Sequence, residues 1–235
     1  MDKDLVSIVK KNSEKEREKL SIKAFKLMAE GVEIIDPNRL DIRGNLTCGE
    51  NVKIDINVII EGDVSLADGV SIGANCILKD CQIGKDTLIH PFSSIDGSVI
   101  GKSCFVGPYG RIRPDSYLGN SVQIGNFVEI KNATINSWTR INHLSFIGDA
   151  DLAEGVTIGA GTITCNHDGF DFNHITIHEG SYIGSGCNLI APLIINKNST
   201  IAAGSTITDE VPSEVLTIAR SRQVTIDSWK GRKSK

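Results

Sequence analysis

Three side chains near the middle of the chain are of types that could do chemistry together. His143 lies in the stretch RINHLSFIGD, and two cations, Arg113 and Lys131, precede it in the sequence. A histidine is the usual general base near neutral pH. Two neighbouring cations suit a phosphate, because the Arg fork and the Lys point charge can both bind it. The alternative is that the cations pair with Glu129 or Asp149, and that His143 is an inert surface residue.

The elements that would position these side chains follow from an internal repeat. Aliphatic residues recur every six positions, with slips of one position, and Gly often comes directly after them. This period fits short strands joined by tight corners, with the aliphatic residue pointing inward. Three hexads make a triangular coil of about 17–18 residues, and coils stack about 4.8 Å apart. The predicted inward positions are Ile54, Ile60, Leu66, Ile72, Leu78, Ile83, Ile89, Ile95, Ile100, Val106, Ile112, Leu118, Ile124, Ile130, Ile135, Ile141, Ile147, Leu152, Ile158, Thr164, Ile177, Ile183, Leu189, Ile195, Ile201 and Ile207.

The repeat also predicts which residues lie above one another. Arg113 and Lys131 are separated by three hexads and fall at one corner of successive coils. His143 falls at the preceding corner, between Asn126 and Ala160. These two corners bound one face, which is about 13 Å wide at the rise of a strand. A sugar phosphate could lie across this face, with its phosphate at the cations and its reacting group at His143.

One segment interrupts the repeat. The residues CNHDGFDFNHIT, 165–176, leave the coil at the corner of Arg113 and Lys131, where they can fold over the same face as a lid or wall. If the segment inserts seven residues, Ser185 and Ala203 fall in the column of His143. Their small side chains would leave a smooth surface for an extended ligand.

The two ends of the chain lack the repeat, which predicts three regions. Residues 1–46 form an N-terminal helical segment and connector, residues 47–210 form the β-helix, and residues 211–235 form a basic tail. The tail is either solvated or contacts an anionic ligand.

The N-terminal segment has the spacing of a helix at Leu20, Ala24, Leu27 and Met28, and Gly31 can end it. We expect this helix to cap the open end of the solenoid, and the alternative is a helical contact within a trimer.

Composition excludes several classes of protein. The 235 residues carry a net charge of −4, which argues against a protein that coats nucleic acid. No apolar run reaches the length of about 18 residues that a membrane span needs, and MDKDLVSIVKKNSEKEREK has no signal-peptide core. We therefore expect a cytoplasmic protein. The six cysteines include no CxxC pair, and we expect them to be reduced thiols.

Several longer stretches resemble a known family. RIRPDSYLGNSVQIGNFVEIKNATI, NHLSFIGDA, IGAGTITCNHDG, YIGSG, TIAAGSTIT and TIARS are similar to the acetyltransferase domain of the bacterial bifunctional N-acetylglucosamine-1-phosphate uridyltransferase/glucosamine-1-phosphate acetyltransferases. The similarity runs from about Ile22 to the C-terminus and includes the connector DPNRLDIRG. It implies an all-β fold, a left-handed parallel β-helix of hexapeptide repeats. The Gly-rich nucleotide loop of the uridyltransferase domain is absent, so uridyltransferase activity is not expected.

The resemblance implies an acetyl-CoA-dependent N-acetyltransferase of nucleotide-sugar and cell-envelope biosynthesis. The resemblance also implies a homotrimer with active sites between subunits, and a reaction that requires no metal. The default acceptor is glucosamine 1-phosphate. His143 matches the general base, and the backbone N–H of Ala160 matches the group that stabilises the oxyanion. The matched binding residues are Arg113, Lys131 and Asn166 for the sugar phosphate, and Ser185, Ala203 and Arg220 for the coenzyme. Glu129 and Asn126 are placed where they could orient the site.

The chain departs from the family at four positions in this region. The family has Tyr where this chain has Phe146 and His167, Asn where it has Thr157, and Lys where it has Phe172. In the family the residues at 146, 157 and 172 contact sugar hydroxyls or phosphate. Donor chemistry is therefore expected to be intact and acceptor recognition altered, because a missing hydrogen-bond partner for a buried group costs about 1–3 kcal/mol.

Three alternatives stay open. The acceptor could be a different amino sugar, including a nucleotide-linked one. The chain could be a non-catalytic trimeric ligand-binding relative with a decayed sugar site. It could also be a metal-dependent hydratase like the gamma-class carbonic anhydrases, although that site needs three converging histidines and only His143 and His167 are candidates here.

Overall fold

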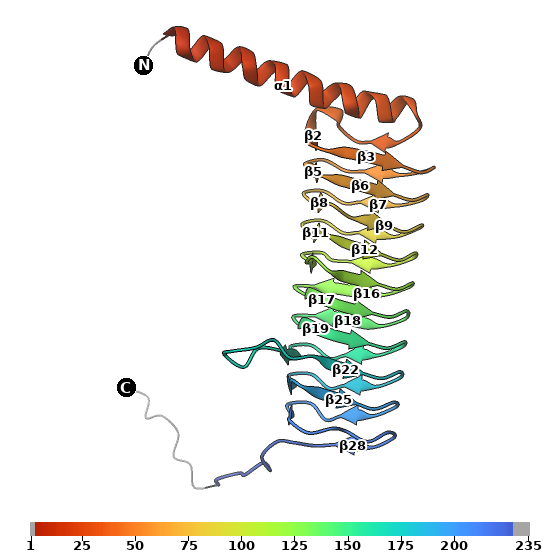
Figure 1. Ribbon diagram of the computed structural model, residues 1–235, viewed down its shortest axis with the longest axis vertical. Helices are drawn as coiled ribbons and strands as arrows, with labels where there is room; N and C mark the ends of the chain where they lie inside the picture. The colour runs from red at the N-terminus through yellow and green to blue at the C-terminus, as the bar shows by residue number, and fades with distance from the viewer. Residues whose placement is uncertain (1–2, 228–235) are drawn as a thin grey trace.

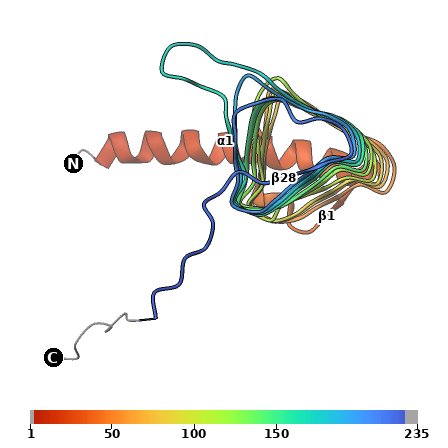
Figure 2. The same ribbon diagram turned by 90° about the horizontal axis from the view of Figure 1, so that it is seen from below.

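A computed structural model of the chain describes residues 3–227. The chain winds into a parallel β-helix with a triangular cross-section, preceded by one long helix (Figures 1 and 2). The all-β solenoid of hexapeptide repeats is thus confirmed. Its three flat sides are called here the first, second and third faces, in the order in which each coil visits them.

The first face is a sheet with 11 strands within the described residues. Its strands, in spatial order, are β1 (Glu33–Ile34), β4 (Lys53–Ile54), β7 (Ser71–Ile72), β10 (Leu88–Ile89), β13 (Phe105–Val106), β16 (Gln123–Asn126), β18 (Arg140–His143), β20 (Thr157–Ile158), β23 (Tyr182–Ile183), β26 (Thr200–Ile201) and β28 (Leu216–Thr217).

The second and third faces are joined into one sheet because β17 (Glu129–Ile135) and β19 (Phe146–Leu152) each run around the corner between them. The other strands of the second face are β2 (Leu40–Ile42), β5 (Val58–Glu61), β8 (Ile77–Lys79), β11 (Ser94–Asp96), β14 (Arg111–Ile112), β21 (Ile163–Cys165), β24 (Asn188–Ile190) and β27 (Thr206–Ile207). Those of the third face are β3 (Asn45–Cys48), β6 (Asp63–Leu66), β9 (Gln82–Ile83), β12 (Ser98–Ile100), β15 (Ser116–Leu118), β22 (Ile175–Ile177) and β25 (Leu193–Ile195).

The core is the column of aliphatic side chains inside the triangle. Every predicted inward position is at most 3% exposed, including Thr164. Ile112 pairs with Ile130, a separation of three hexads, and Ile124 pairs with Ile141, which is one position less. The coil length predicted from the hexads is therefore confirmed. Burial of this apolar column is the main term that stabilises the solenoid.

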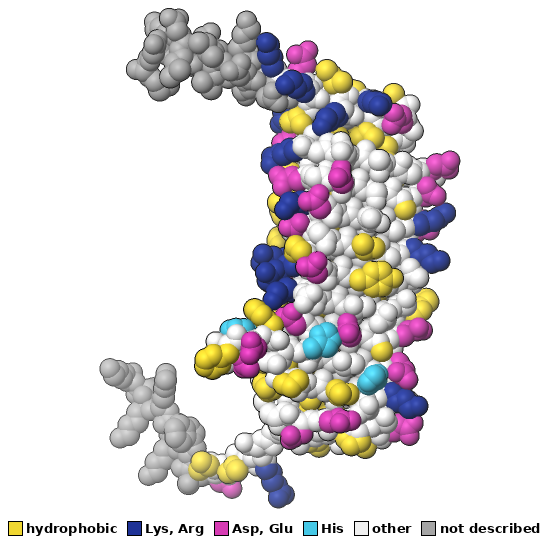
Figure 3. Space-filling view, viewed as in Figure 1, with side chains coloured by type: hydrophobic (Ala, Val, Ile, Leu, Met, Phe, Trp, Pro, Cys, Tyr) yellow, Lys and Arg dark blue, Asp and Glu magenta, His cyan; other side chains and the backbone are white. Residues whose placement is uncertain are grey.

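The predicted excursion is a loop that stands out from the corner between the second and third faces (Figures 1 and 2). It connects β21 to β22, and its protrusion is plain in the space-filling view (Figure 3). Across it, Leu152 pairs with Ile177 and Ile158 pairs with Ile183. The partners in both pairs are seven positions further apart in the sequence than three hexads, so the predicted length of the insertion is confirmed.

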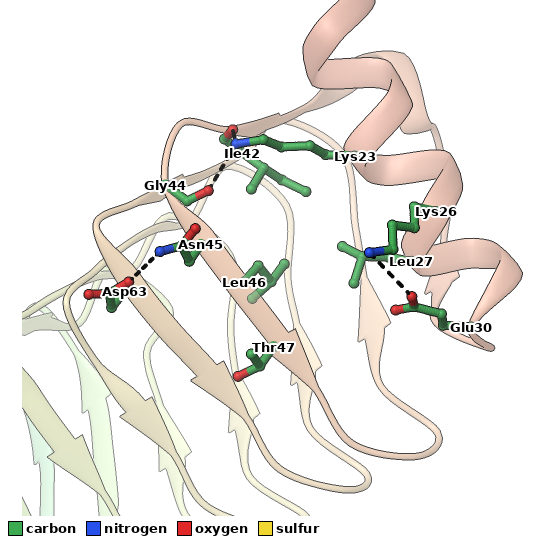
Figure 4. A pocket seen from close by; sticks show the side chains of 10 residues that line it. All are labelled: Lys23, Lys26, Leu27, Glu30, Ile42, Gly44, Asn45, Leu46, Thr47 and Asp63. Atoms are coloured by element: carbon green, nitrogen blue, oxygen red, sulfur yellow. Dashed lines mark hydrogen bonds and ion pairs between the residues drawn. The ribbon is translucent and has the colours of Figure 1, made fainter.

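The helix α1 (Lys3–Ala29) lies with its C-terminal part across the end of the solenoid, and Gly31, at φ +102°, follows it (Figure 1). Ala24 and Leu27 are buried, while Met28 is 39% exposed. Lys23 Nζ donates to the carbonyls of residues 42 and 44 at 3.1 and 3.0 Å, beside a cavity of about 610 Å³ (Figure 4). The predicted cap is therefore present, and a trimer contact by α1 stays a prediction.

The predicted β-helix, residues 47–210, is shorter at both ends than the solenoid in the structure. Strands β1 to β3 already form the first coil, so the segment interpreted as a connector belongs to the solenoid. Ile34 pairs with Ile54 across this coil, which is longer than three hexads because it includes the 3-10 turn η1 (Pro37–Arg39). At the other end, β28 pairs with β26, so the repeat extends to Thr217. Residues 1–2 and 228–235 of the predicted terminal regions lie outside the described residues.

The six cysteines are free thiols, as predicted, and four of them are buried. Burial raises the pKa of Cys81 to about 12.

Candidate active site

His143 lies at the end of β18, at the corner between the first and second faces. Its register partner is Asn126, and His143 Nδ1 is 2.9 Å from Asn126 Oδ1. An amide oxygen can only accept, so in the neutral imidazole Nδ1 carries the proton and Nε2 has the lone pair. The exposed imidazole is therefore fixed in the tautomer that a general base at Nε2 requires.

The coils that follow continue this column. The N–H of Gly161 donates to the His143 carbonyl at 3.3 Å, which places Ala160 next to His143. The N–H of Gly186 donates to Ala160, and that of Gly204 donates to Ser185, both at 2.8 Å. Ser185 and Ala203 thus extend the column as predicted. We call Asn126, His143, Ala160, Ser185 and Ala203 the His143 column.

Ala160 also has a free donor. Its neighbours Gly159 and Gly161 donate their N–H groups to the carbonyls of Ile183 and His143. Within residues 3–227, no partner is found for the N–H of Ala160. A free N–H one coil from the imidazole is available to stabilise negative charge.

The residues that follow the members of the His143 column differ in size on the two sides of this corner. The residue after each column member has a positive φ, and on the N-terminal side these residues are bulky: Phe127 is 54% exposed and Leu144 is 62% exposed. On the C-terminal side they are Gly161, Gly186 and Gly204, which adopt this conformation without strain. The glycines leave the corner bare along Ala160, Ser185 and Ala203.

Arg220 lies at the far end of this bare corner. It is exposed, and its guanidinium donates to the carbonyl of Ala203. The cation predicted to meet coenzyme phosphates is therefore at the end of the His143 column.

The two predicted cations lie on the second face in register with each other, since the N–H of Arg113 donates to the carbonyl of Ile130. Both have carboxylate partners. Arg113 Nη1 is 3.0 Å from Glu129 Oε1, and Lys131 Nζ is 3.4 Å from Asp149 Oδ2. The carboxylate pairing considered as the alternative to phosphate is thus present in the structure.

A charge pattern along this column nevertheless sets the two cations apart. We call the column the charged column, and it reads Arg43, Glu61, Lys79, Asp96, Arg113, Lys131. Arg43 pairs with Glu61 at 2.9 Å and Lys79 with Asp96 at 3.6 Å, so charges alternate along it. The alternation breaks at Arg113 and Lys131, where two cations are adjacent. Figure 3 shows Lys and Arg side chains gathered at the solenoid's edge beside the protruding loop. Two adjacent cations favour an anion between them.

Asp149 is a buried carboxylate that organises this corner. It is 7% exposed and accepts from Asn132 Nδ2 at 2.6 Å, from Lys131 and from Asn166. Burial alone would raise its pKa, but the amide hydrogen bonds and the charge of Lys131 outweigh burial and lower the pKa of Asp149. The sequence suggested Asp149 only as a partner of Lys131. The sequence signal for Asp149 was its position about one coil after Lys131, which predicts an ion pair but not the burial of the carboxylate.

The protruding loop meets the cations, as predicted. The ammonium of Lys131 lies 4.1 Å from the centroid of the Phe172 ring, and the His167 ring packs against Phe172 at 4.7 Å. Asp168 holds the loop tip by accepting the N–H groups of Phe170 and of residue 171. The loop therefore forms a wall at the cationic end of the second face.

Two further predicted residues differ in their accessibility. Phe146 lies on β19 between Glu129 and Ile163, and its ring covers Gly148, where a Cβ would come within 2.6 Å of it. It is thus on the surface between His143 and the cations. Asn166 is 8% exposed, and its amide nitrogen is occupied by Asp149. Asn166 is therefore placed to position that carboxylate.

Thr157 is not brought to this surface. It lies on the first face, paired with Arg140 and Tyr182. Thr157 precedes inward Ile158, which belongs to the hexads of the first face, whereas Phe146 precedes inward Ile147 of the second face, and this difference in hexad was the available sequence signal. Thr157 of the same chain does not join the second-face site.

Membrane-spanning helices and metal-binding clusters are both absent from the described part of the chain. Among residues 3–227, no helix combines the length and apolar character of a membrane span. The same residues contain no cluster of three or more His, Cys, Asp or Glu side chains arranged to hold a metal ion.

The chain matches two families of repeat domains. The family described as GMPPB C-terminal domain matches residues 42–144, and the family described as bacterial transferase hexapeptide (six repeats) matches residues 174–209.

Curated relatives include the bifunctional protein GlmU of Azoarcus sp. (strain BH72), which is 48% identical over 207 residues, 88% of this chain and 46% of that protein. The GlmU protein of Nitrosospira multiformis is 51% identical over 207 residues, 88% of this chain and 45% of that protein. The chain spans about half the length of these relatives. A solved structure, UDP-N-acetylglucosamine acyltransferase from Campylobacter jejuni, is similar in fold, with a TM-score of 0.50, 22% identity and coverage of 70% of each chain.

Proposed function

Because this chain belongs to the GlmU family and corresponds to its hexapeptide-repeat part, we propose that it transfers the acetyl group of acetyl-CoA to the amine of an amino-sugar phosphate. The default acceptor is glucosamine 1-phosphate. The observation that carries the proposal is one face bounded by two kinds of group. His143 stands at one corner with Nδ1 bonded to Asn126, and the adjacent cations Arg113 and Lys131 stand at the other.

In the proposed mechanism, His143 Nε2 removes a proton from the acceptor amine as its nitrogen attacks the thioester carbonyl. Asn126 holds the ring through Nδ1, which leaves Nε2 for the acceptor amine. The carbonyl oxygen becomes an oxyanion, which the free N–H of Ala160 stabilises. When the tetrahedral intermediate collapses, the C–S bond breaks and the proton on His143 passes to the coenzyme thiolate.

Arg113 and Lys131 would hold the acceptor phosphate. Glu129 and Asp149 pair with these two side chains, and a phosphate would add to these contacts. The Arg fork and the Lys point charge are complementary donors for its oxygens.

Acetyl-CoA would lie along the bare corner. Its thioester would be near Ala160, its extended arm would pass Ser185 and Ala203, and its phosphates would meet Arg220. Glycine at each corner position removes the side chains that would block this path.

The assembly we propose is a homotrimer in the cytoplasm, with each active site between two subunits. Thr157 supports this arrangement indirectly, because it lies on the first face and could meet the second-face site only from another copy.

The test of this proposal is the release of free thiol from acetyl-CoA with a panel of amino sugars, their 1-phosphates and nucleotide-linked amino sugars. We expect release with at least one acceptor that carries an anomeric phosphate. If acetyl-CoA binds but no acceptor is acetylated, the chain is a non-catalytic ligand-binding relative and the proposal fails.

The altered acceptor preference has its own test in the double variant Phe146→Tyr with Phe172→Lys. We expect it to use glucosamine 1-phosphate better than the parent chain, because it restores a hydrogen-bond donor and a cation. The single variants separate the two contributions.

A further inference from the structure

The surface between His143 and the two cations is poor in hydrogen-bonding groups. The outward positions there are Glu129, Phe146 and Ile163, in register on successive coils. Ile163 is 43% exposed, and the ring of Phe146 lies over Gly148. An acceptor that reaches from His143 to Lys131 must therefore cross an apolar strip.

The polar side chains beside this strip are already bonded within the chain. Glu129 pairs through one oxygen, Oε1, with Arg113 and with Arg111, at 3.0 and 3.6 Å. The hydroxyl of Thr164 is buried and bonds the backbone of Gly148 in both directions. Ser145 Oγ donates to the carbonyl of His143 at 2.8 Å. These groups offer an acceptor no spare neutral donor over the ring of Phe146.

The loop adds a second apolar group at the cationic end of the strip. Phe172 is 64% exposed and lies on Lys131, which is in register with Gly148 under the Phe146 ring. The Phe172 ring thus lies against the ammonium that would bind phosphate, and the Phe146 ring lies over the next position of the same column. A sugar hydroxyl placed over these rings would lose water and gain no partner from the rings themselves.

From this geometry we infer that the acceptor is an amino sugar with a phosphate on its anomeric carbon that lacks the C4 or the C6 hydroxyl of glucosamine, and that the edge without this hydroxyl lies on Phe146. The inference rests on the proposed function and names the acceptor class for the same site. The anomeric phosphate is shared by sugar 1-phosphates and nucleoside diphosphate sugars. A site built for a hydroxyl would present a donor or acceptor at positions 146 and 163, and this one presents carbon at both.

The test measures kcat/KM for acetyl transfer to glucosamine 1-phosphate and to its 6-deoxy and 4-deoxy analogues. The UDP-linked form of each sugar is the parallel arm, and it shows which source of the phosphate is used. We expect one deoxy analogue to exceed the hydroxylated sugar by about 10-fold or more. Phe146→Tyr should lower the ratio of kcat/KM for the deoxy analogue to kcat/KM for the hydroxylated sugar, because the added phenol gives the sugar hydroxyl a hydrogen-bond partner. Phe92→Tyr, at a ring that is 50% exposed and three coils away, is the matched control and should leave the ratio unchanged.

Each outcome decides a different statement. Preference for the hydroxylated sugar in both arms overturns the inference and leaves the proposed function intact. Preference for a deoxy sugar that Phe146→Tyr does not narrow overturns the role given to this ring, and with it the inference. Transfer to none of these acceptors overturns the proposed function together with the inference.

Discussion

Replacing Asp149 by Asn is expected to destabilise the chain although the two side chains have the same shape. Asp149 sits at φ +50°, which Asn tolerates, so the backbone is not strained by the change. Oδ1 of Asp149 accepts from Asn132, whereas Oδ2 accepts from Lys131 and Asn166, so an amide oxygen that stays with Asn132 leaves the amide nitrogen facing the donors of Lys131 and Asn166. Because Asn166 is buried, its lost acceptor costs about 2 kcal/mol. Lys131 can recover water and should add little.

The matched control is Asp151→Asn, two residues further along the same strand. Asp151 pairs with His174 at 3.1 Å, but its side chain is 53% exposed. An exposed ion pair contributes about 0–1 kcal/mol. Thermal unfolding followed by circular dichroism, at one protein concentration, should show Asp149→Asn melting about 4–8 °C lower than the parent chain. Equal shifts for the two variants would refute the reasoning that burial makes Asp149 different.

The stability difference between the parent chain and Asp149→Asn should depend on pH in one direction. The pKa of Asp149 is lowered in the folded state, because hydrogen bonds and Lys131 outweigh the opposing effect of burial. Its stabilisation is therefore complete above the unfolded pKa of about 3.9 and is lost as pH falls through the lower folded value. The gap between the parent chain and Asp149→Asn should stay constant from neutral pH to about pH 5 and close below about pH 3.9. A gap that widens on acidification would contradict this account.

Four further outcomes follow from the same structure. Asn126→Ala should lower kcat without changing the KM for acetyl-CoA, by no more than the roughly 10²–10⁴-fold that a general base supplies; an unchanged kcat would show that the tautomer is set elsewhere. Lys131→Ala should raise the KM for the sugar phosphate about 10–100-fold and leave that for acetyl-CoA unchanged; equal effects on both would contradict its placement. Arg220→Ala should raise the KM for acetyl-CoA alone, measured at saturating acceptor. Cys81 should resist iodoacetamide at pH 8 until the chain is unfolded, because burial raises its pKa to about 12; mass spectrometry that finds it labelled in the native protein would contradict this.

Much of the solenoid could be predicted because each coil repeats one simple requirement, an aliphatic side chain inside each face. The ends could not be predicted in the same way. Between Ile34 and Ile42 the turn η1 lengthens the chain, which shifts the six-residue phase. At the other end, Ile201 pairs with Thr217, which comes before three full hexads are complete, so both spacing and residue type depart from the pattern.

The columns of the candidate site could be predicted because register follows directly from coil length. Asn126 beside His143 is the clearest case. Side-chain direction at the corners was not predictable. Asn132, Asp149 and Asn166 fall in one column by spacing, but spacing does not report that the Asp149 side chain is buried and accepts from both neighbours. Family resemblance placed Thr157 with Phe146, but resemblance does not distinguish residues of one copy from those of another.

The most direct test of the central claim is the rate of thiol release from acetyl-CoA by His143→Ala, with the best acceptor of the panel at saturation. His178→Ala, which removes a histidine far from the second-face site, is the control and should keep the parent rate. The account predicts that kcat of His143→Ala falls about 10²–10⁴-fold while acetyl-CoA still binds. A rate equal to that of the parent chain would contradict the assignment of His143 as the base.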